Sequence, residues 1–145
     1  MAQKTVLIID DEQGYIEPLV DALLHEGYRV LTAENGADGL ATAQQNKIDL
    51  AIIDVMMPPG PSLAGQTSRQ KTGVYVVNEL RRRFPRLQMC SLSVITDPET
   101  ISEIQRNGVR FMRKGETSLK HVLETVKGML ATGPGSTGTI RRWSG

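Results

Sequence analysis

Three acidic residues in this sequence follow directly on short apolar runs. Asp10 and Asp11 come after residues 6–9 (VLII), and Asp54 comes after residues 50–53 (LAII). Where such carboxylates meet, joint ionisation is costly unless a cation neutralises them. A hard divalent ion with oxygen ligands suits such a cluster, and Mg²⁺ is the cytosolic choice. The residue types therefore predict an acidic magnesium site, provided that the fold brings the runs together.

Two further residues carry groups that a phosphoryl transfer needs. A carboxylate beside Mg²⁺, here Asp54, can act as a nucleophile and form an aspartyl-phosphate. The phosphoryl group in transfer needs positive charge and hydrogen-bond donors around its oxygens. Lys114 follows the strand-like run 109–112 and offers an ammonium group, whereas Thr96 follows the run 89–95 and offers a hydroxyl.

The elements that must position these side chains alternate along the chain. Strand-like runs occupy residues 6–9, 30–31, 50–53, 89–95 and 109–112, and apolar residues at helical spacing lie after each of them. Five such alternations predict an α/β fold, a (βα)5 doubly wound open parallel sheet with helices on both faces. In these sheets the functional crevice lies at the carboxyl ends of the strands, where the acids, Thr96 and Lys114 are expected to meet.

Composition limits the remaining function classes. The 145 residues suit one domain, and 17 basic against 16 acidic residues give a net charge of +1, too small to indicate nucleic acid or an anionic membrane. The lone cysteine, Cys90, excludes disulfides within the chain and fits a reducing compartment. With neither a signal peptide nor an apolar run long enough to span a membrane, we expect a cytoplasmic protein.

Four segments, in order along the chain, resemble the receiver (CheY-like) domains of bacterial two-component response regulators: residues 9–11 (IDD), 53–58 (IDVMMP), 94–96 (VIT) and 111–114 (FMRK). The resemblance runs from about residue 5 to residue 130 and implies a flavodoxin-like strand order 2-1-3-4-5. Residues 1–130 are thus predicted to form a receiver domain, and residues 131–145 a flexible tail or linker.

The resemblance implies a role for each site residue. Asp54 corresponds to the phosphoacceptor. Asp11, Asp54 and the backbone carbonyl of Met56 correspond to Mg²⁺ ligands, with Asp10 assisting through water. Thr96 and Lys114 correspond to the residues that bind the phosphoryl oxygens, and Phe111 to the aromatic residue that turns inward when the switch threonine moves.

The resemblance also implies partners and a type of activity. A histidine kinase or phosphotransfer protein donates the phosphoryl group, and the domain catalyses only its own phosphorylation and dephosphorylation. The surface formed by the fourth helix, fifth strand and fifth helix then binds a downstream protein, which the sequence does not identify, or a second copy of the domain. No membrane and no direct nucleic-acid binding are implied, and the chain is either a stand-alone receiver or part of a longer regulator.

Several features depart from the family pattern. Residues 58–71 form a loop about eleven residues longer than usual, which is either a tolerated surface insertion or a lid over Asp54. Asp97 and Met56 stand at positions that influence access to the phosphate, and we expect slow hydrolysis because neither Met56 nor Pro98 can orient a water. Gly115 replaces the usual proline after the lysine and predicts a trans peptide bond.

Other interpretations of the same residues remain open. Taken alone, Asp10 and Asp11 suit a helix N-cap, and residues 81–83 (RRR) suit a solvated helix face. A receiver-like interaction module that works without phosphorylation is one alternative function. A phosphohydrolase with an aspartyl nucleophile is another, but it requires a second acid where Met56 stands.

Overall fold

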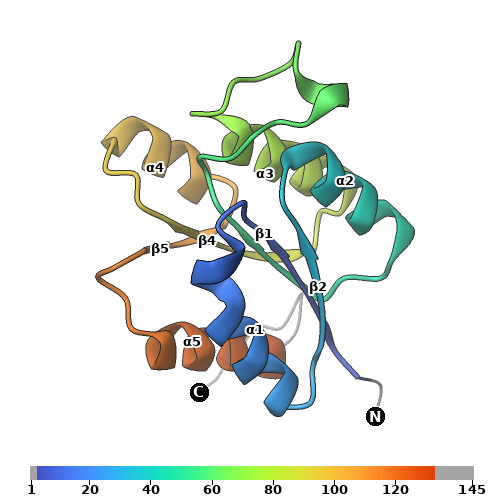
Figure 1. The fold of residues 1–145 in the computed structure, drawn as a ribbon, viewed down its shortest axis with the longest axis vertical. Helices are drawn as coiled ribbons and strands as arrows, with labels where there is room; N and C mark the ends of the chain where they lie inside the picture. The colour runs from blue at the N-terminus through green and yellow to red at the C-terminus, as the bar shows by residue number, and fades with distance from the viewer. Residues whose placement is uncertain (1–2, 133–145) are drawn as a thin grey trace.

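The computed structural model describes residues 3–132 of the chain. Five strands alternate with five helices, as predicted (Figure 1). In chain order these are β1 (Thr5–Ile9), α1 (Gln13–His25), β2 (Arg29–Ala33), α2 (Gly36–Gln45), β3 (Leu50–Ile53), α3 (Thr72–Arg83), β4 (Gln88–Ser93), α4 (Pro98–Gln105), β5 (Arg110–Arg113) and α5 (Leu119–Thr132).

The strands form one parallel sheet in the order β2-β1-β3-β4-β5. This confirms the predicted α/β class and strand order. Because all strands run the same way, their carboxyl ends lie along a single edge of the sheet. The order also places β3 at the centre, so that Asp54, which follows it, lies between residues that follow β1 and β4.

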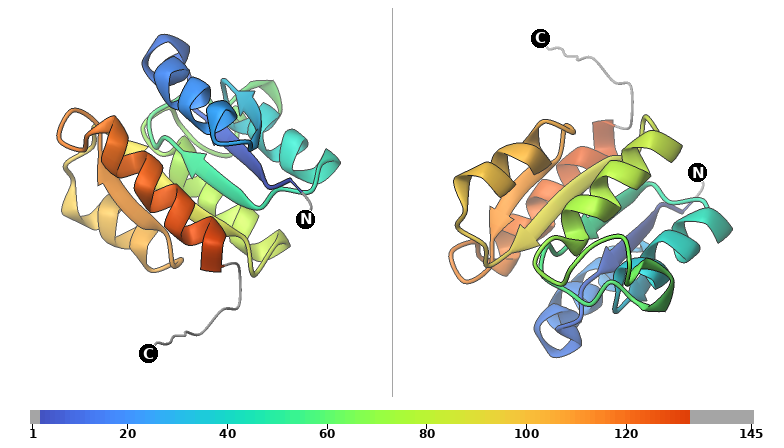
Figure 2. Two further views of the ribbon diagram at one scale, coloured as in Figure 1. Left: turned by 90° about the horizontal axis from the view of Figure 1, so that it is seen from below. Right: turned by 90° about the horizontal axis from the view of Figure 1, so that it is seen from above.

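Side chains alternate between the two faces of the sheet, and each face has its own core. On β1, Leu7 and Ile9 pack with apolar residues of α2, α3 and α4. Val6 and Ile8 point the other way and pack with residues of α1 and α5. The helices therefore lie in two layers around the sheet (Figure 2), and the four buried residues of β3 are apolar because both of its faces are covered.

Several predicted boundaries differ from the structure by one or two residues, and two of them bear on the site and on the predicted tail. The fourth strand ends at Ser93 rather than at residue 95, because the apolar residues Val94 and Ile95 continue past the last ladder pair, Ser93 with Arg113. The last helix continues through Thr132, so the first two residues of the predicted tail are helical, and the rest of that tail lies outside the described residues. The predicted trans geometry before Gly115 is confirmed, because residues 3–132 contain no cis peptide bond. The fourth helix, α4, has eight residues.

The long connection between β3 and α3 is an ordered, packed segment. It contains a short 3₁₀ turn, Pro61–Leu63, whose Leu63 is buried against the α2 and α3 side of the core. The carbonyls of Pro58 and Pro59 accept hydrogen bonds from the first two amides of α2, at 3.0 and 2.8 Å. The segment therefore covers α2 and the start of α3 (Figure 2, right). Within residues 3–132, no helix is both long and apolar enough to cross a membrane.

Candidate functional site

The sheet ladder brings the chain segments after β1, β3, β4 and β5 to one place. Asp54 N donates to the carbonyl of Ile9, the last residue of β1, at 2.9 Å, and so Asp54 lies beside Asp10. On the other side, Lys114 N donates to the carbonyl of Ser93 at 2.9 Å. Parallel pairing thus positions residues that are up to a hundred positions apart in the sequence.

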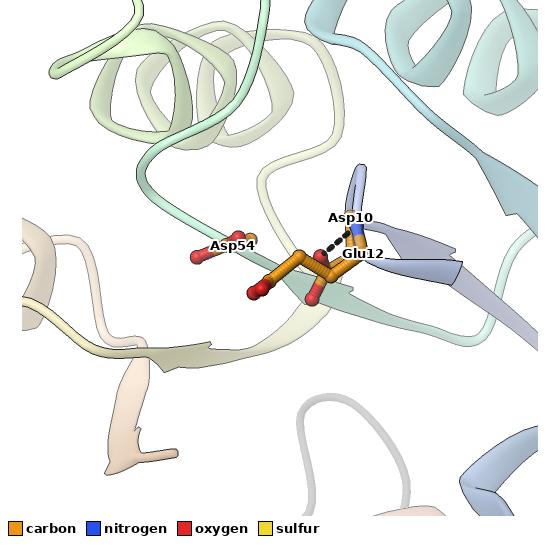
Figure 3. Close-up of side chains that lie close together, drawn as sticks. All are labelled: Asp10, Glu12 and Asp54. Carbon is orange, nitrogen blue, oxygen red and sulfur yellow. Dashed lines mark hydrogen bonds between the residues drawn. The ribbon is translucent and has the colours of Figure 1, made fainter. Parts of the chain in front are cut away.

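Three carboxylates meet at this edge. Oxygens of Asp10, Glu12 and Asp54 all lie within 4.8 Å of one another (Figure 3). Asp10 Oδ1 accepts a hydrogen bond from Glu12 N at 2.8 Å, and Asp54 Oδ1 accepts one from Val55 N at 2.8 Å. Backbone amides therefore fix the orientation of both aspartates, and the oxygens that remain are suitable donors for a hard divalent cation. Glu12, which follows the predicted pair of acids, was not expected in the cluster.

Lys114 offsets part of the negative charge of this cluster. Its Nζ lies 2.8 Å from Asp10 Oδ2, 2.7 Å from Glu12 Oε1 and 3.3 Å from Asp54 Oδ2, and 4.8 Å from the centre of the Tyr15 ring. The Lys114 side chain is only 3% exposed. Burial acts to lower the pKa of Lys114, but its contacts with Asp10 and Glu12 and the charge of Asp54 outweigh burial and raise that pKa above the ordinary value. The lysine is therefore a fixed positive charge at the site.

Asp54 is a buried carboxyl with opposing influences on its ionisation. Its side chain is 4% exposed. Burial and, after it, the charge of Asp10 raise the pKa of Asp54 to about 6, while Lys114 and the Ser93 hydroxyl act to lower it. The group is therefore mostly ionised at neutral pH, but its ionised form is less stable than that of an exposed aspartate.

The hydroxyl beside Asp54 belongs to Ser93, not to the predicted Thr96. Ser93 is fully buried, and its Oγ lies close enough to influence Asp54 yet makes no full hydrogen bond within residues 3–132. Thr96 is exposed, three residues beyond the end of β4, and no contact brings it to the cluster in the described part of the chain. The sequence pointed to Thr96 because Val94 and Ile95 extend the apolar run and obscure where the strand ends.

Asp97 and Pro98 begin α4 rather than facing Asp54. The Asp97 carboxylate accepts hydrogen bonds from Thr100 N at 3.3 Å and Thr100 Oγ1 at 2.6 Å, which caps the helix and lowers the pKa of Asp97. Pro98 occupies the first turn. The structure therefore does not place Asp97 or Pro98 next to Asp54. Met56, two residues after Asp54, is 36% exposed at the rim of the site.

Phe111 lies on β5, opposite Ser91 of β4, and is half-buried. Its neighbour Met112 packs with α1 and α5 residues, so alternation along the strand turns Phe111 toward the α3 and α4 side. The aromatic ring thus belongs to the β5 edge next to α4, within the surface where the resemblance places the output.

Asp11 forms an ion pair of its own, separate from the other acids. Its Oδ2 lies 2.6 Å from Nη2 of Arg69, a residue of the long β3–α3 connection. Among the described residues, Asp11 is not part of the close group of carboxylates formed by Asp10, Glu12 and Asp54. Sequence reasoning identified Asp11 but missed Arg69, because nothing in a polar loop indicates which of its side chains folds back to the sheet.

The first turn of α3 packs closely against the chain segment that follows β3. Gly73 N donates to the carbonyl of Val55 at 2.8 Å. A Cβ at position 73 would lie 2.3 Å from the Asp54 carbonyl oxygen and 2.4 Å from Val55 Cα. Only glycine permits this approach, which holds the segment after Asp54 against the helix.

The chain is similar to known proteins along most of its length. A profile of the family described as the response regulator receiver domain matches residues 6–126. Protein PilH of Pseudomonas aeruginosa is 43% identical over 68 residues, which are 46% of this chain and 54% of PilH. The probable transcriptional regulatory protein TcrX of Mycobacterium tuberculosis is 32% identical over 89 residues, 61% of this chain but 33% of TcrX. The matches thus span about half or less of these relatives.

Solved structures share the fold. A CheY-like receiver domain protein from Methanospirillum hungatei superposes with a TM-score of 0.77 at 21% identity and covers 90% of this chain and 95% of that one. Chemotaxis protein CheY4 of Vibrio cholerae superposes with a TM-score of 0.71 at 26% identity, covering 88% of this chain and 98% of that one. The sheet and its two helical layers therefore form a fold that these solved structures share.

Proposed function

Because the chain belongs to the response regulator receiver domain family of two-component systems, we propose that Asp54 accepts a phosphoryl group from a histidine kinase or phosphotransfer protein and thereby switches a protein-binding surface. The observation that carries this proposal is the contact of a nearly buried Asp54 with Lys114 inside a cluster of acids. A buried, ionised carboxylate destabilises the fold unless a cation or a covalently attached group compensates its charge.

The acidic cluster fits Mg²⁺, the cation of receiver domains. Its donor set consists entirely of carboxylate oxygens, which suits a hard divalent ion better than a softer metal. We propose that Asp10, Asp11, Asp54 and the carbonyl of Met56 hold the ion, with Glu12 beside them. When bound, Mg²⁺ neutralises the carboxylates and the phosphoryl oxygens together.

Asp54, Lys114 and Ser93 then have different roles in the phosphoryl transfer. An Asp54 oxygen attacks phosphorus, and the new O–P bond forms as the P–N bond to the donor imidazole breaks. The buried ammonium of Lys114 and the hydroxyl of Ser93 lie next to Asp54, and we assign to them the binding of the phosphoryl oxygens. With a pKa of about 6, Asp54 is already ionised at neutral pH and needs no general base.

Phosphorylation would act on the surface formed by α4, β5 and α5. The buried Ser93 hydroxyl, which makes no full hydrogen bond among the described residues, gains a charged acceptor. Movement at the end of β4 then changes the space next to Phe111 on β5. The result is a shift between two populated arrangements, which favours binding of a downstream protein or of a second copy of the domain. We place this activity in the cytoplasm, where a histidine kinase presents its phosphoryl group.

The lifetime of phospho-Asp54 is expected to be long, as Met56 has no polar group that could orient an attacking water at the rim of the site. The structure gives no support to a contribution from Asp97 or Pro98, because both belong to the start of α4. A half-life of seconds to a few minutes for the purified phosphoprotein with Mg²⁺ would contradict this expectation.

Treatment with acetyl phosphate and Mg²⁺ tests the proposal directly. Intact-mass measurement should show one added phosphoryl group in the wild-type chain and none in Asp54→Asn. Asp21→Asn is the matched control, since Asp21 is an exposed aspartate of α1, and it should be labelled like the wild type. Equal labelling of Asp54→Asn and wild type would refute the assignment of Asp54, and removal of Mg²⁺ by EDTA should prevent labelling of the wild type and of Asp21→Asn.

A further inference from the structure

Arg69 is a second cation at the carboxyl edge of the sheet, and it comes from the part of the chain that is longer than usual in receiver domains. Its Nη2 lies 2.6 Å from Asp11 Oδ2. Lys114, the first cation, contacts Asp10, Glu12 and Asp54. All four acids at this edge therefore have an internal positive partner, and Asp11 has one of its own.

The backbone around Arg69 is held in place independently of its side chain. The Arg69 carbonyl accepts a hydrogen bond from Met57 N at 3.2 Å, and Thr72 Oγ1 donates to the carbonyl of Ser68 at 2.9 Å. Farther along the segment, Leu63 is buried in the core. These anchors fix the backbone at Arg69, so the ion pair with Asp11 requires ordering of the Arg69 side chain but little additional ordering of the loop.

The contact between Arg69 and Asp11 bears on which carboxylates are available to a cation. Asp10, Glu12 and Asp54 have oxygens within 4.8 Å of one another, and Asp11 is not in that group among the residues described. The Asp11 carboxylate is thus paired with Arg69 and lies outside that group among the described residues. A cation that needs Asp11 must either break this pair or bind next to a guanidinium, and like charges repel in both the approach and the bound state.

From these contacts we infer that Arg69 sets the affinity of the acidic cluster for Mg²⁺, by competing with the ion for Asp11. The inference rests on the proposed magnesium site and adds a residue to it. Arg69 and Asp11 are 52% and 20% exposed, so the competing pair is weakened by solvent. The expected effect of its removal is therefore modest, about two- to fivefold tighter Mg²⁺ binding.

Calorimetric titration of the unphosphorylated proteins with Mg²⁺ alone tests the inference. Arg69→Gln keeps the length and polarity of the side chain and removes its charge. Lys71→Gln is the matched control: Lys71 lies two residues away in the same segment, is 48% exposed, and contacts Thr100 and Glu103 of α4 instead of Asp11. We expect Kd for Mg²⁺ to fall two- to fivefold in Arg69→Gln and to change clearly less in Lys71→Gln.

Three outcomes of the calorimetric titration would overturn the inference. An unchanged or weaker affinity in Arg69→Gln would show no competition, and an equal gain in both variants would show a general charge effect. If the wild type and both variants show no saturable Mg²⁺ binding, the magnesium site itself fails and the inference with it. A second readout does not depend on affinity: the NMR signal of the Arg69 Nε–H group should shift during the Mg²⁺ titration of the wild type, and a signal that stays in place would contradict displacement.

Discussion

Two groups of ion pairs lie side by side at the carboxyl edge of the sheet, and they differ in burial. In the inner group, Lys114 contacts Asp10 and Asp54, and all three side chains are 3–4% exposed. In the outer group, Arg69 contacts Asp11 with exposed fractions of 52% and 20%. Solvent screens the outer pair and hardly reaches the inner one, so equal distances correspond to different energies. The inner group determines whether the acids can coexist, and the outer pair adjusts one of them.

Replacement of the inner cation should have the largest effect. Lys114→Met leaves Asp10 and Asp54 buried without their partner, and we expect it to lower the free energy of unfolding by about 3–5 kcal/mol at neutral pH in EDTA. Lys127→Met is the matched control, because Lys127 forms a 3.1 Å pair with Glu26 at the surface, where its side chain is 45% exposed. Urea denaturation measures both, and equal losses would show that burial of the inner group has no energetic consequence.

Replacement of Asp54 should change the stability of the inner group in a way that depends on pH. The folded protein raises the pKa of Asp54 from 3.8 to about 6, so between these values the folded state binds more protons than the unfolded one. Stability from this group is therefore present at low pH and is lost as pH rises toward 6. In EDTA at pH about 7.5, Asp54→Asn should be more stable than wild type by about 1–3 kcal/mol.

The same comparison near pH 4 provides the check on that prediction. There the carboxyl of Asp54 is protonated in the folded protein, and the advantage of Asp54→Asn should largely disappear. Asp21→Asn, on the exposed side of α1, should alter stability by no more than about 0.5 kcal/mol at either pH. An advantage of Asp54→Asn that stays the same at both pH values would mean that ionisation of Asp54 is not its cause.

The inner and outer groups also differ in how well they can be predicted. The apolar runs of β1 and β3 end in acids, and parallel pairing then brings Asp10, Asp54 and Lys114 together, as expected from the sequence. Ser93 was missed because strand ends depend on ladder pairing, which apolar residues beyond the last pair obscure. Arg69 was missed because its position depends on how a long polar segment packs on α2, and periodicity says nothing about such packing.

Substitutions at the two hydroxyls test whether the inner group includes Ser93 and excludes Thr96. Ser93→Ala removes the buried hydroxyl beside Asp54 and should slow phosphorylation by acetyl phosphate about tenfold, which corresponds to about 1.4 kcal/mol of barrier. Thr96→Ala, at an exposed position, should leave the rate unchanged. Rates come from intact mass against time at saturating Mg²⁺. The reverse ranking would return the phosphoryl-binding role to Thr96.

Removal of the outer cation should have the smallest effect on stability. Arg69→Gln breaks a half-exposed pair in a segment that Leu63 and backbone hydrogen bonds hold independently, so the free energy of unfolding in EDTA should fall by less than about 1 kcal/mol. The difference should shrink further in about 1 M NaCl, where charges are screened within about 3 Å. Urea denaturation at low and high salt measures it. A salt-independent loss as large as that of Lys114→Met would show that the two ion-pair groups form one coupled network, because only a buried charge resists screening in this way.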